Sequence, residues 1–284
     1  MAGLTTVLVA NADDFGLSSG INRGIKSAYC EGILRSASLM PNGPAFDDAV
    51  GIARENPGLG VGVHISLVDE RCIAPVERLR GLVAADGSLP SSHGAFVKAF
   101  LARRFDVVQI RIEIEAQVAG VLAAGIAPTH IDFHQHLHML PGVFDVVQNI
   151  AQSTGINVVR IPLDHAPQAG SVARRLQTRI LSVFCMCNAS KLVKAGVRFS
   201  DHFHGLGQSG NMNESNLLAT LRRLKPGVNE VMMHPGFSDP ATAARYDWGY
   251  HWEDEHAALV SKPVRRFIEE RSIRLATFAD AWLT

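Results

Sequence analysis

The chain has 284 residues, of which 47% are hydrophobic and 19% are charged, and its 27 basic residues equal its 27 acidic residues. This amount of apolar material can form one large core or two modest ones. The balanced charge argues against a nucleic-acid partner, because such a partner usually requires a strongly basic chain. No uninterrupted apolar run approaches the roughly 20 residues that a membrane-spanning helix needs, so we predict no integral membrane segment.

The beginning of the chain and its cysteines point to the cytoplasm. A short apolar run is followed at once by two acids, which favours a first core strand over a signal peptide. The four cysteines have neither the Cys-x-x-Cys spacing of a metal or redox motif nor the density of a disulfide framework. We interpret them as reduced thiols and predict a cytoplasmic protein.

Short apolar segments rich in β-branched residues alternate with longer segments of helical period along the whole chain. We predict strands over residues 5–10, 34–40, 60–67, 129–133, 157–161, 197–199, 229–233 and 273–277. We predict helices over residues 20–31, 45–55, 94–104, 107–124, 143–153, 172–194, 214–224 and 257–270. This alternation predicts a parallel α/β sheet, closed as a barrel or open, and the absence of a repeat or linker favours one domain over residues 1–284.

Acidic and histidine side chains are placed where four of the predicted strands end. Asp13 and Asp14 come directly after the first strand, and His64 lies near the end of the third. Residues 130–138 straddle the end of another strand, and His234 follows the strand 229–233. The carboxyl ends of parallel strands open onto one face, where sites of α/β proteins form. The sequence therefore predicts one site that draws on four segments.

The segment from residue 130 to residue 138 is the strongest single feature. It places His130, Asp132, His134, His136 and His138 at every second position. If the segment is extended, all five side chains point to the same side. Imidazoles together with carboxylates bind divalent metal ions well, so we predict a metal site here. Five groups cannot all be ligands, so some must orient the ligands or contact a substrate.

Other polar and aromatic features have simpler interpretations. By themselves, Asp13 and Asp14 would suit a helix cap or an Asx turn. The remaining histidines are expected to be ordinary core or surface residues, with His202 and His204 the strongest candidates for exceptions because they follow a weak strand. The aromatic segment 246–252 suits packing over the rim of the sheet, with a platform for a sugar ring as the alternative.

A metal site with a nearby carboxylate and histidine suits hydrolysis. A divalent ion polarises a scissile carbonyl and lowers the pKa of its bound water. A free carboxylate can accept the proton of that water, and a histidine on the other side can protonate the departing amine. The four segments supply a candidate for each of these roles.

Four motifs occur in the order of a known family. They are Asn-Ala-Asp-Asp-Phe-Gly-Leu-Ser at residues 11–18, Gly-Val-His at 62–64, Thr-His-Ile-Asp-Phe-His-Gln-His-Leu-His at 129–138, and Glu-Val-Met-Met-His-Pro at 230–235. With them, the chain resembles the YdjC-like carbohydrate deacetylases from about residue 6 to residue 238. That family includes chitooligosaccharide deacetylases and deacetylases associated with hopanoid biosynthesis.

The resemblance implies a fold, a metal ion and its ligands. The expected fold is a distorted (β/α) barrel in the α/β class, and the expected cofactor is one divalent metal ion, Mg or Zn. By motif position, the metal ligands are Asp14, His64 and His134. The resemblance also implies a homodimer.

The same resemblance assigns roles around the metal. Asp13 is expected to act as the general base, with Arg160 supporting it, and His234 is expected to act as the partner acid. Four further residues are expected to contact the substrate or to orient the ligands: Phe15, Asp132, His136 and His138.

The function that follows is a metal-dependent deacetylase that removes the N-acetyl group of an N-acetylglucosamine-type sugar through a metal-activated water. The sugar is either a chitooligosaccharide or a glycolipid head group, because residues 63–69 and 85–87 favour the hopanoid branch and the segment 130–138 favours the other. One alternative is a metal-dependent barrel hydrolase of a non-sugar amide or ester. Another is a non-catalytic sugar- or lipid-binding protein with a structural metal, although a closed structural site tends to have four protein ligands.

Overall fold

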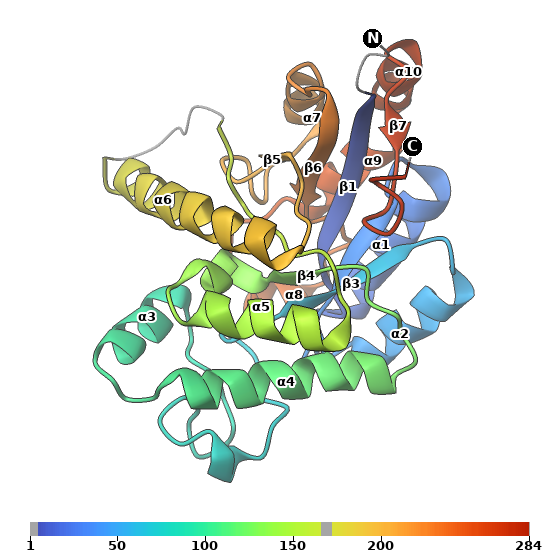
Figure 1. The fold of residues 1–284 in the computed structure, drawn as a ribbon. Coiled ribbons are helices and arrows are strands. Elements are labelled where there is room, and N and C mark those ends of the chain that lie inside the picture. Colours follow the sequence, from blue (N-terminus) through green and yellow to red (C-terminus); the bar gives the residue numbers. More distant parts are fainter. Residues whose placement is uncertain (1–4, 166–171, 284) are drawn as a thin grey trace.

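A parallel β-sheet forms the centre of the protein and helices surround it (Figure 1). The computed structural model describes residues 5–165 and 172–283. Strand order in the sheet is β4-β3-β2-β1-β6-β5, with β7 beside β1, and every pairing is parallel. The strands are β1 (Thr6–Phe15), β2 (Ser36–Leu39), β3 (Gly60–Ile65), β4 (Ile131–Phe133), β5 (His202–His204), β6 (Gly227–Met233) and β7 (Arg274–Leu275).

The two edges of the sheet are joined by isolated bridges in place of a regular strand. Val159 bridges Ile131 of β4, and Asp164 bridges Phe203 of β5, so residues 158–164 run between the two edge strands. The predicted distorted (β/α) barrel is thereby confirmed. The predictions of regular strands over residues 157–161 and 197–199 are wrong, because those segments contribute only bridges, one of them between Val158 and Arg198.

Ten α-helices and two short 3₁₀ helices lie in the described parts of the chain. Six of the α-helices begin at a capping side chain; for example, Ser18 accepts from the backbone N–H of Ile21, and Asp106 forms a capping box with Gln109. The helices are α1 (Ser19–Glu31), α2 (Phe46–Glu55), α3 (His93–Leu101), α4 (Val107–Ala123), α5 (Val143–Thr154), α6 (Val172–Ala195), α7 (Glu214–Leu221), α8 (Pro240–Arg245), α9 (Trp252–Val260), α10 (Lys262–Glu270), η1 (Val76–Arg78) and η2 (His134–Met139).

One predicted helix is divided in two. The helical period over residues 257–270 continues through a break at Ser261, which has extended backbone and caps α10 by accepting from the N–H of Val264. Pro263 follows at the second position of α10, where its missing N–H costs nothing. The helix α8 was not predicted at all. Within the described residues, no helix is both long and apolar enough to cross a membrane.

The inward face of β1, the central strand, changes from apolar to polar along its length. Val7 and Val9, near the start of β1, belong to a small apolar cluster that also contains Val228 and Phe278. Two and four residues further on, Asn11 and Asp13 are equally buried but polar. Side chains two apart share a face of a strand, so one face of β1 is apolar at its beginning and polar at its carboxyl end. The polar residues of β1 therefore gather at the carboxyl end of the barrel.

Candidate metal and active site

Two neighbouring aspartates both enter the site because β1 is irregular at its end. Adjacent residues of a regular strand point to opposite faces. Asp14 has φ 64°, in the left-handed region, and the pairing of β1 with β2 shifts register between Ala12 and Phe15. Asp13 and Asp14 are each at most 2% exposed, and each finds its own partners in the site. The prediction that the pair follows the strand is corrected, because β1 continues through both residues.

Asp14, His64 and His134 converge on one point inside the carboxyl end of the barrel. Each offers one ligand atom, and these atoms lie within 4.8 Å of one another. The Oδ1 atom of Asp14 is 3.1 Å from His134 Nδ1 and 3.3 Å from His64 Nε2. The three residues come from β1, β3 and the start of η2, and all are buried. Three separate segments therefore bring the predicted ligand set together.

The chemistry of this cluster fits a divalent cation. Within the described residues, Asp14 Oδ2 and His64 Nε2 are buried without a hydrogen-bond partner. A buried polar atom without a partner costs free energy, which a bound cation would offset. Three protein ligands also leave coordination positions open, as in catalytic sites.

The carboxylates around the cluster favour a positive charge there, carried either by protons on the histidines or by a metal ion. Burial lowers the pKa of His64, but the carboxylates of Asp132 and Asp13 outweigh burial and raise that pKa to about 10. Burial likewise lowers the pKa of His134, while Asp14 raises it to about 9. Since a metal ion requires neutral imidazole, it would take the place of these protons. The site thus holds an excess of negative charge that either a proton or a metal can balance.

Asp132 lies behind the cluster and orients it. Its Oδ1 is 2.8 Å from His64 Nδ1, so His64 is held through the ring nitrogen that faces away from Asp14. Its Oδ2 accepts from Ser38 Oγ at 2.7 Å and lies 2.8 Å from Arg160. Carboxylates that hold a metal-binding histidine in this way fix the orientation of its ring.

A second group of potential ligands is less suited to a metal. Asp13, His64 and Asp132 also have ligand atoms within 4.8 Å of one another. However, both carboxylates of that group already contact the guanidinium of Arg160. A cation there would compete with a fixed positive charge, so the group with Asp14 and His134 is the better metal site.

Arg160 is fully buried and is surrounded by three carboxylates. It donates to both oxygens of Asp13, at 2.6 Å and 2.7 Å, and its Nε is 2.5 Å from Glu230 Oε1. Asn11 donates to Asp13 as well, at 2.8 Å. Burial raises the pKa of Glu230 to about 7, against the opposing effect of Arg160. This network holds Asp13 in one orientation beside the cluster. The predicted contact between Arg160 and Asp13 is present, and Glu230 is a partner that the sequence reasoning missed.

The histidine-rich segment is not extended along its whole length. β4 ends at Phe133, and Gln135 and His136 have φ 55° within η2. The prediction of five side chains on one side is therefore wrong beyond Phe133. His138 stacks on Phe133 with its Nε2 2.9 Å from the carbonyl of Arg160.

Of the other histidines of the segment, His130 and His138 are buried and His136 is half-buried. Burial lowers the pKa of His130 and of His138 to about 4 and lowers that of His136 as well. His130 lies between Ser38 and Thr129, at 2.9 Å from each. His136 faces the edge of Phe203. Of the segment, only Asp132 and His134 belong to the charged cluster.

His234 follows β6 and is fixed by α9. Its backbone N–H donates to Glu255, and its Nδ1 lies 3.7 Å from a carboxylate oxygen of that residue. Burial lowers the pKa of His234, but the nearby carboxylate of Glu255 outweighs burial and raises it above the usual value. Glu255 was missed by the sequence reasoning, although an acid next to Ala258 and Leu259 on the buried face of a helix was a signal.

The aromatic segment 246–252 packs directly beside the site. The ring of Trp248 is 4.9 Å from the ring of His134, and that of Tyr250 is 4.6 Å from that of His234. The hydroxyl of Tyr246 donates to Glu70, which ties the aromatic segment to residues 68–92, a polar excursion that follows β3.

Three further residues singled out from the sequence lie outside the charged cluster. The Phe15 side chain is fully buried in the hydrophobic core, so we assign it to packing and not to substrate contact. His202 and His204 lie on β5 and line a different pocket.

These features define a class of protein: a parallel α/β barrel with an acid–histidine cluster at the carboxyl ends of its strands. Residues 7–270 match the sequence profile of the family described as YdjC-like protein, and the chain belongs to that family. The membership predicted from the four motifs is confirmed.

Similar proteins extend over almost the whole chain. A carbohydrate deacetylase of Thermoanaerobacter pseudethanolicus is 31% identical, covering 96% of this chain and 98% of its own. A carbohydrate deacetylase of Homo sapiens is 30% identical, covering 96% and 90%. The crystal structure of a putative cellobiose-phosphate cleavage protein of Enterococcus faecalis has the same fold, with a TM-score of 0.78 at 24% identity over 96% of this chain and 98% of that one.

Proposed function

We propose that this protein is a metal-dependent deacetylase that hydrolyses the N-acetyl group of an N-acetylglucosamine-type sugar. The observation that carries the proposal is the convergence of Asp14, His64 and His134 beside an aspartate, Asp13, that Arg160 holds with two hydrogen bonds. Relatives named carbohydrate deacetylase, about 30% identical over nearly the full length, support the sugar class.

Asp14, His64 and His134 would hold the metal ion. Two imidazoles and one carboxylate suit zinc and similar transition metals better than magnesium, which prefers oxygen ligands. When bound, such an ion supplies Lewis-acid chemistry, polarising the amide carbonyl and lowering the pKa of a water molecule. Asp132 keeps the His64 ring oriented toward the ion through Nδ1.

The remaining steps are proton transfers by residues of this chain. The carboxylate of Asp13 accepts the proton of the attacking water, and Arg160 and Asn11 hold it in place. His234 donates a proton to the departing amine. Because Nδ1 of His234 is the ring nitrogen near Glu255, Nε2 is the proposed donor. The carboxylate of Glu255 favours the protonated ring before the reaction.

An apolar groove beside the site supports a sugar that is joined to an apolar group. The groove has a volume of about 660 Å³ and lies between α3, η2 and α6. Its lining includes Leu101, Ile180 and Phe184, together with Gln135 and His136, which follow His134 in the chain. A glycolipid whose sugar occupies the metal site could place its apolar part there, so we favour this substrate over a free chitooligosaccharide.

The test is amine release from diacetylchitobiose and, separately, from an N-acetylglucosaminyl lipid by the zinc-loaded protein. We expect turnover of the glycolipid that is lost in Asp13→Asn and His134→Ala and kept in Glu270→Gln, a change of an exposed residue. Asp13→Asn should still bind the metal, and His134→Ala should not. Release from neither substrate by a metal-loaded protein would overturn the proposal and favour a non-sugar amide or ester hydrolase, or a sugar- or lipid-binding protein.

Three further expectations from the sequence remain part of this proposal. They are a single domain over residues 1–284, a cytoplasmic location and a homodimer. Sedimentation equilibrium of the metal-loaded protein would test the dimer, since a mass of one chain at micromolar concentration would contradict it.

A further inference from the structure

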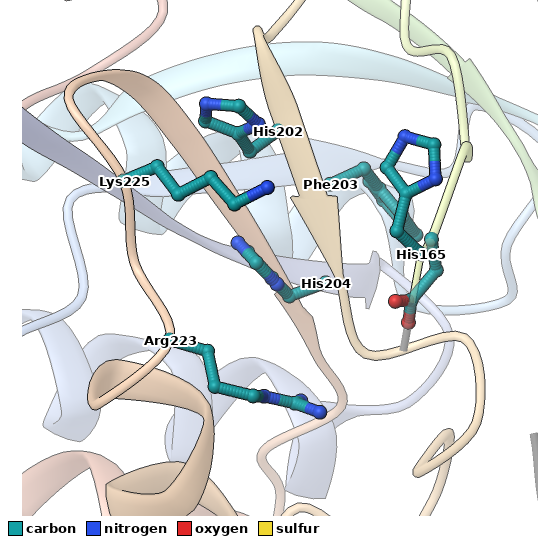
Figure 2. Close-up of a pocket in the computed structure, with 7 residues that line it drawn as sticks. His165, His202, Phe203, His204, Arg223 and Lys225 are labelled. Atoms are coloured by element: carbon teal, nitrogen blue, oxygen red, sulfur yellow. The ribbon is translucent and has the colours of Figure 1, made fainter. Parts of the chain in front are cut away.

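A small pocket lies on the outer face of β5, outside the barrel (Figure 2). It has a volume of about 160 Å³. Side chains of a strand alternate, so Phe203 points inward, with its ring 5.7 Å from the guanidinium carbon of Arg160. His202 and His204 point to the other side, toward the pocket. We call it the β5 pocket; its lining is Asp164, His165, His202, Phe203, His204, Arg223 and Lys225.

Positive and potentially positive groups dominate this pocket. Arg223 and Lys225 reach it from the segment between α7 and β6, and Figure 2 shows them on the same side of the strand as His202 and His204. Neither Arg223 nor Lys225 forms an ion pair with another residue in the described ranges. The whole chain has no net charge, so this concentration of positive charge is a local feature.

One acid lines the pocket, and one of its histidines, His204, is buried. Asp164 accepts from the backbone N–H groups of Gly205 and Leu206, at 3.2 Å and 3.1 Å. His204 is 9% exposed, with its Nε2 3.4 Å from Asn229 Oδ1. Burial lowers the pKa of His204; the hydrogen bond to Asn229 and the charge of Asp164 oppose this shift, whereas the charge of Arg223 repels the protonated ring. A bound anion would reverse that repulsion.

We propose that the β5 pocket binds a small oxyanion, either inorganic phosphate or the phosphate group of a monoester. A guanidinium, an ammonium and two imidazoles provide the several N–H donors that a phosphate needs, and charge-assisted hydrogen bonds of this kind are among the stronger ones. The pocket has room for one such group. Phe203 separates it from Arg160, so the anion occupies a site of its own, and the inference does not rest on the proposed deacetylase activity.

A cation is excluded by the same residues. Arg223 and Lys225 repel a metal ion, and in the parts of the chain that the structure describes no three ligating atoms converge in this pocket. The size and concavity also argue against a polymer of phosphates, which requires an extended basic surface.

The experiment is calorimetric titration of the full-length protein with inorganic phosphate and with glucosamine 6-phosphate, at constant ionic strength kept with chloride. The pocket variant is Arg223→Gln/Lys225→Gln. The matched control is Arg103→Gln/Arg104→Gln, a basic pair between α3 and α4 that does not line the β5 pocket. We expect saturable binding that weakens about tenfold or more in the pocket variant and less than about twofold in the control.

A second readout locates the ligand. The imidazole resonances of His202 and His204 in a proton–nitrogen NMR spectrum should shift as phosphate saturates the protein. Binding of both ligands would show that free phosphate is sufficient for binding. Binding of glucosamine 6-phosphate alone would show that the pocket also contacts the sugar. No saturable binding of either ligand, equal weakening in both variants, or unshifted histidine resonances would overturn the proposal.

Discussion

Single residues in this protein act through the partners that hold them. Arg160 illustrates this, since its guanidinium contacts Asp13, Asp132 and Glu230 inside the barrel. Three carboxylates close together would repel one another, and the buried cation lets them coexist. Asp132 in turn contacts His64 with its other oxygen. A change at any one of these residues is therefore expected to affect the metal site as well.

Asp132→Asn should weaken metal binding about 10–100-fold, because the variant loses the negative charge that orients and polarises His64. The measurement is competition of the protein with a chromogenic zinc chelator. Ser38→Ala is the control, since it removes a hydrogen bond to Asp132, along with those to Asn11 and His130, but leaves the charge of Asp132 in place. An unchanged zinc affinity in Asp132→Asn would show that His64 is not held as we infer.

His138 should make the protein sensitive to acid. Its folded-state pKa of about 4 lies below the ordinary value of 6.5, so between these values the unfolded chain binds more protons than the folded one. Stability is full above pH 6.5 and falls as the pH drops toward 4, by roughly 3 kcal/mol at most for this residue. Urea unfolding of the metal-free protein should show a shallower pH dependence in His138→Gln. Equal slopes in both proteins would contradict the assignment.

At the scale of elements, strands and helices are positioned by close approaches that leave little space. Gly62 on β3 is one of these, since a Cβ there would lie 2.3 Å from atoms of the His130 ring. That ring is fixed by Ser38 and Thr129 and cannot move aside at low cost. The small residue two positions before His64 thus lets β3 and β4 bring their polar ends together.

Gly62→Ala should destabilise the fold by about 1–3 kcal/mol, because the added methyl group overpacks the strand against His130. Gly51→Ala is the control, since a Cβ at that position in α2 meets nothing within 4 Å. That substitution should stabilise the helix by about 0.5–1 kcal/mol. Thermal unfolding of both variants measures the difference. Equal effects of the two substitutions would contradict the close packing of Gly62 against His130.

Hydrogen bonds to α4 hold the polar excursion of residues 68–92 in place. Glu113 is fully buried and accepts from the backbone N–H groups of Ile73 and Ala74 and from Gln117. Glu113→Ala should cost about 1–3 kcal/mol, because two backbone donors lose their acceptor. Limited proteolysis should then cut residues 68–92 faster, whereas Glu115→Ala, a change on the exposed face of α4, should leave the rate unchanged. A protected excursion in Glu113→Ala would refute this role.

At the scale of the whole molecule, the proposed metal joins three parts of the chain that are distant in sequence. Its ligands come from β1, β3 and η2, and the barrel has to form before they meet. A ligand that binds only the folded state adds to the free energy of unfolding. Metal occupancy should therefore be visible in global stability.

Zinc should raise the unfolding temperature of the chelator-treated protein in a concentration-dependent manner. A free zinc concentration 100 times the dissociation constant corresponds to about 2.7 kcal/mol of added stability. Scanning calorimetry with and without zinc measures the effect, and His134→Ala should show little of it. An equal zinc-induced shift in His134→Ala would place the binding site elsewhere.

The sequence by itself determined the alternation of strands and helices, the end of the barrel that carries the site, and the motifs of the family. These depend on local periodicity and on the position of polar residues at strand ends, and both are readable along the chain. The predictions made from the sequence are wrong where the backbone conformation does not follow the local pattern of residues. The segment after Phe133 keeps a two-residue repeat but turns through left-handed backbone, and residues 157–161 are apolar yet pair only through isolated bridges.

Only the tertiary structure decided which polar residues act together. The sequence assigned no role to Glu230, Glu255 or Glu70, and each becomes a partner of the site because the fold brings its strand, helix or loop next to Arg160, His234 or Tyr246. The β5 pocket is likewise made of residues from three separate segments. Contacts between residues far apart in the chain leave no periodic trace in a single sequence, because packing and not spacing brings them together.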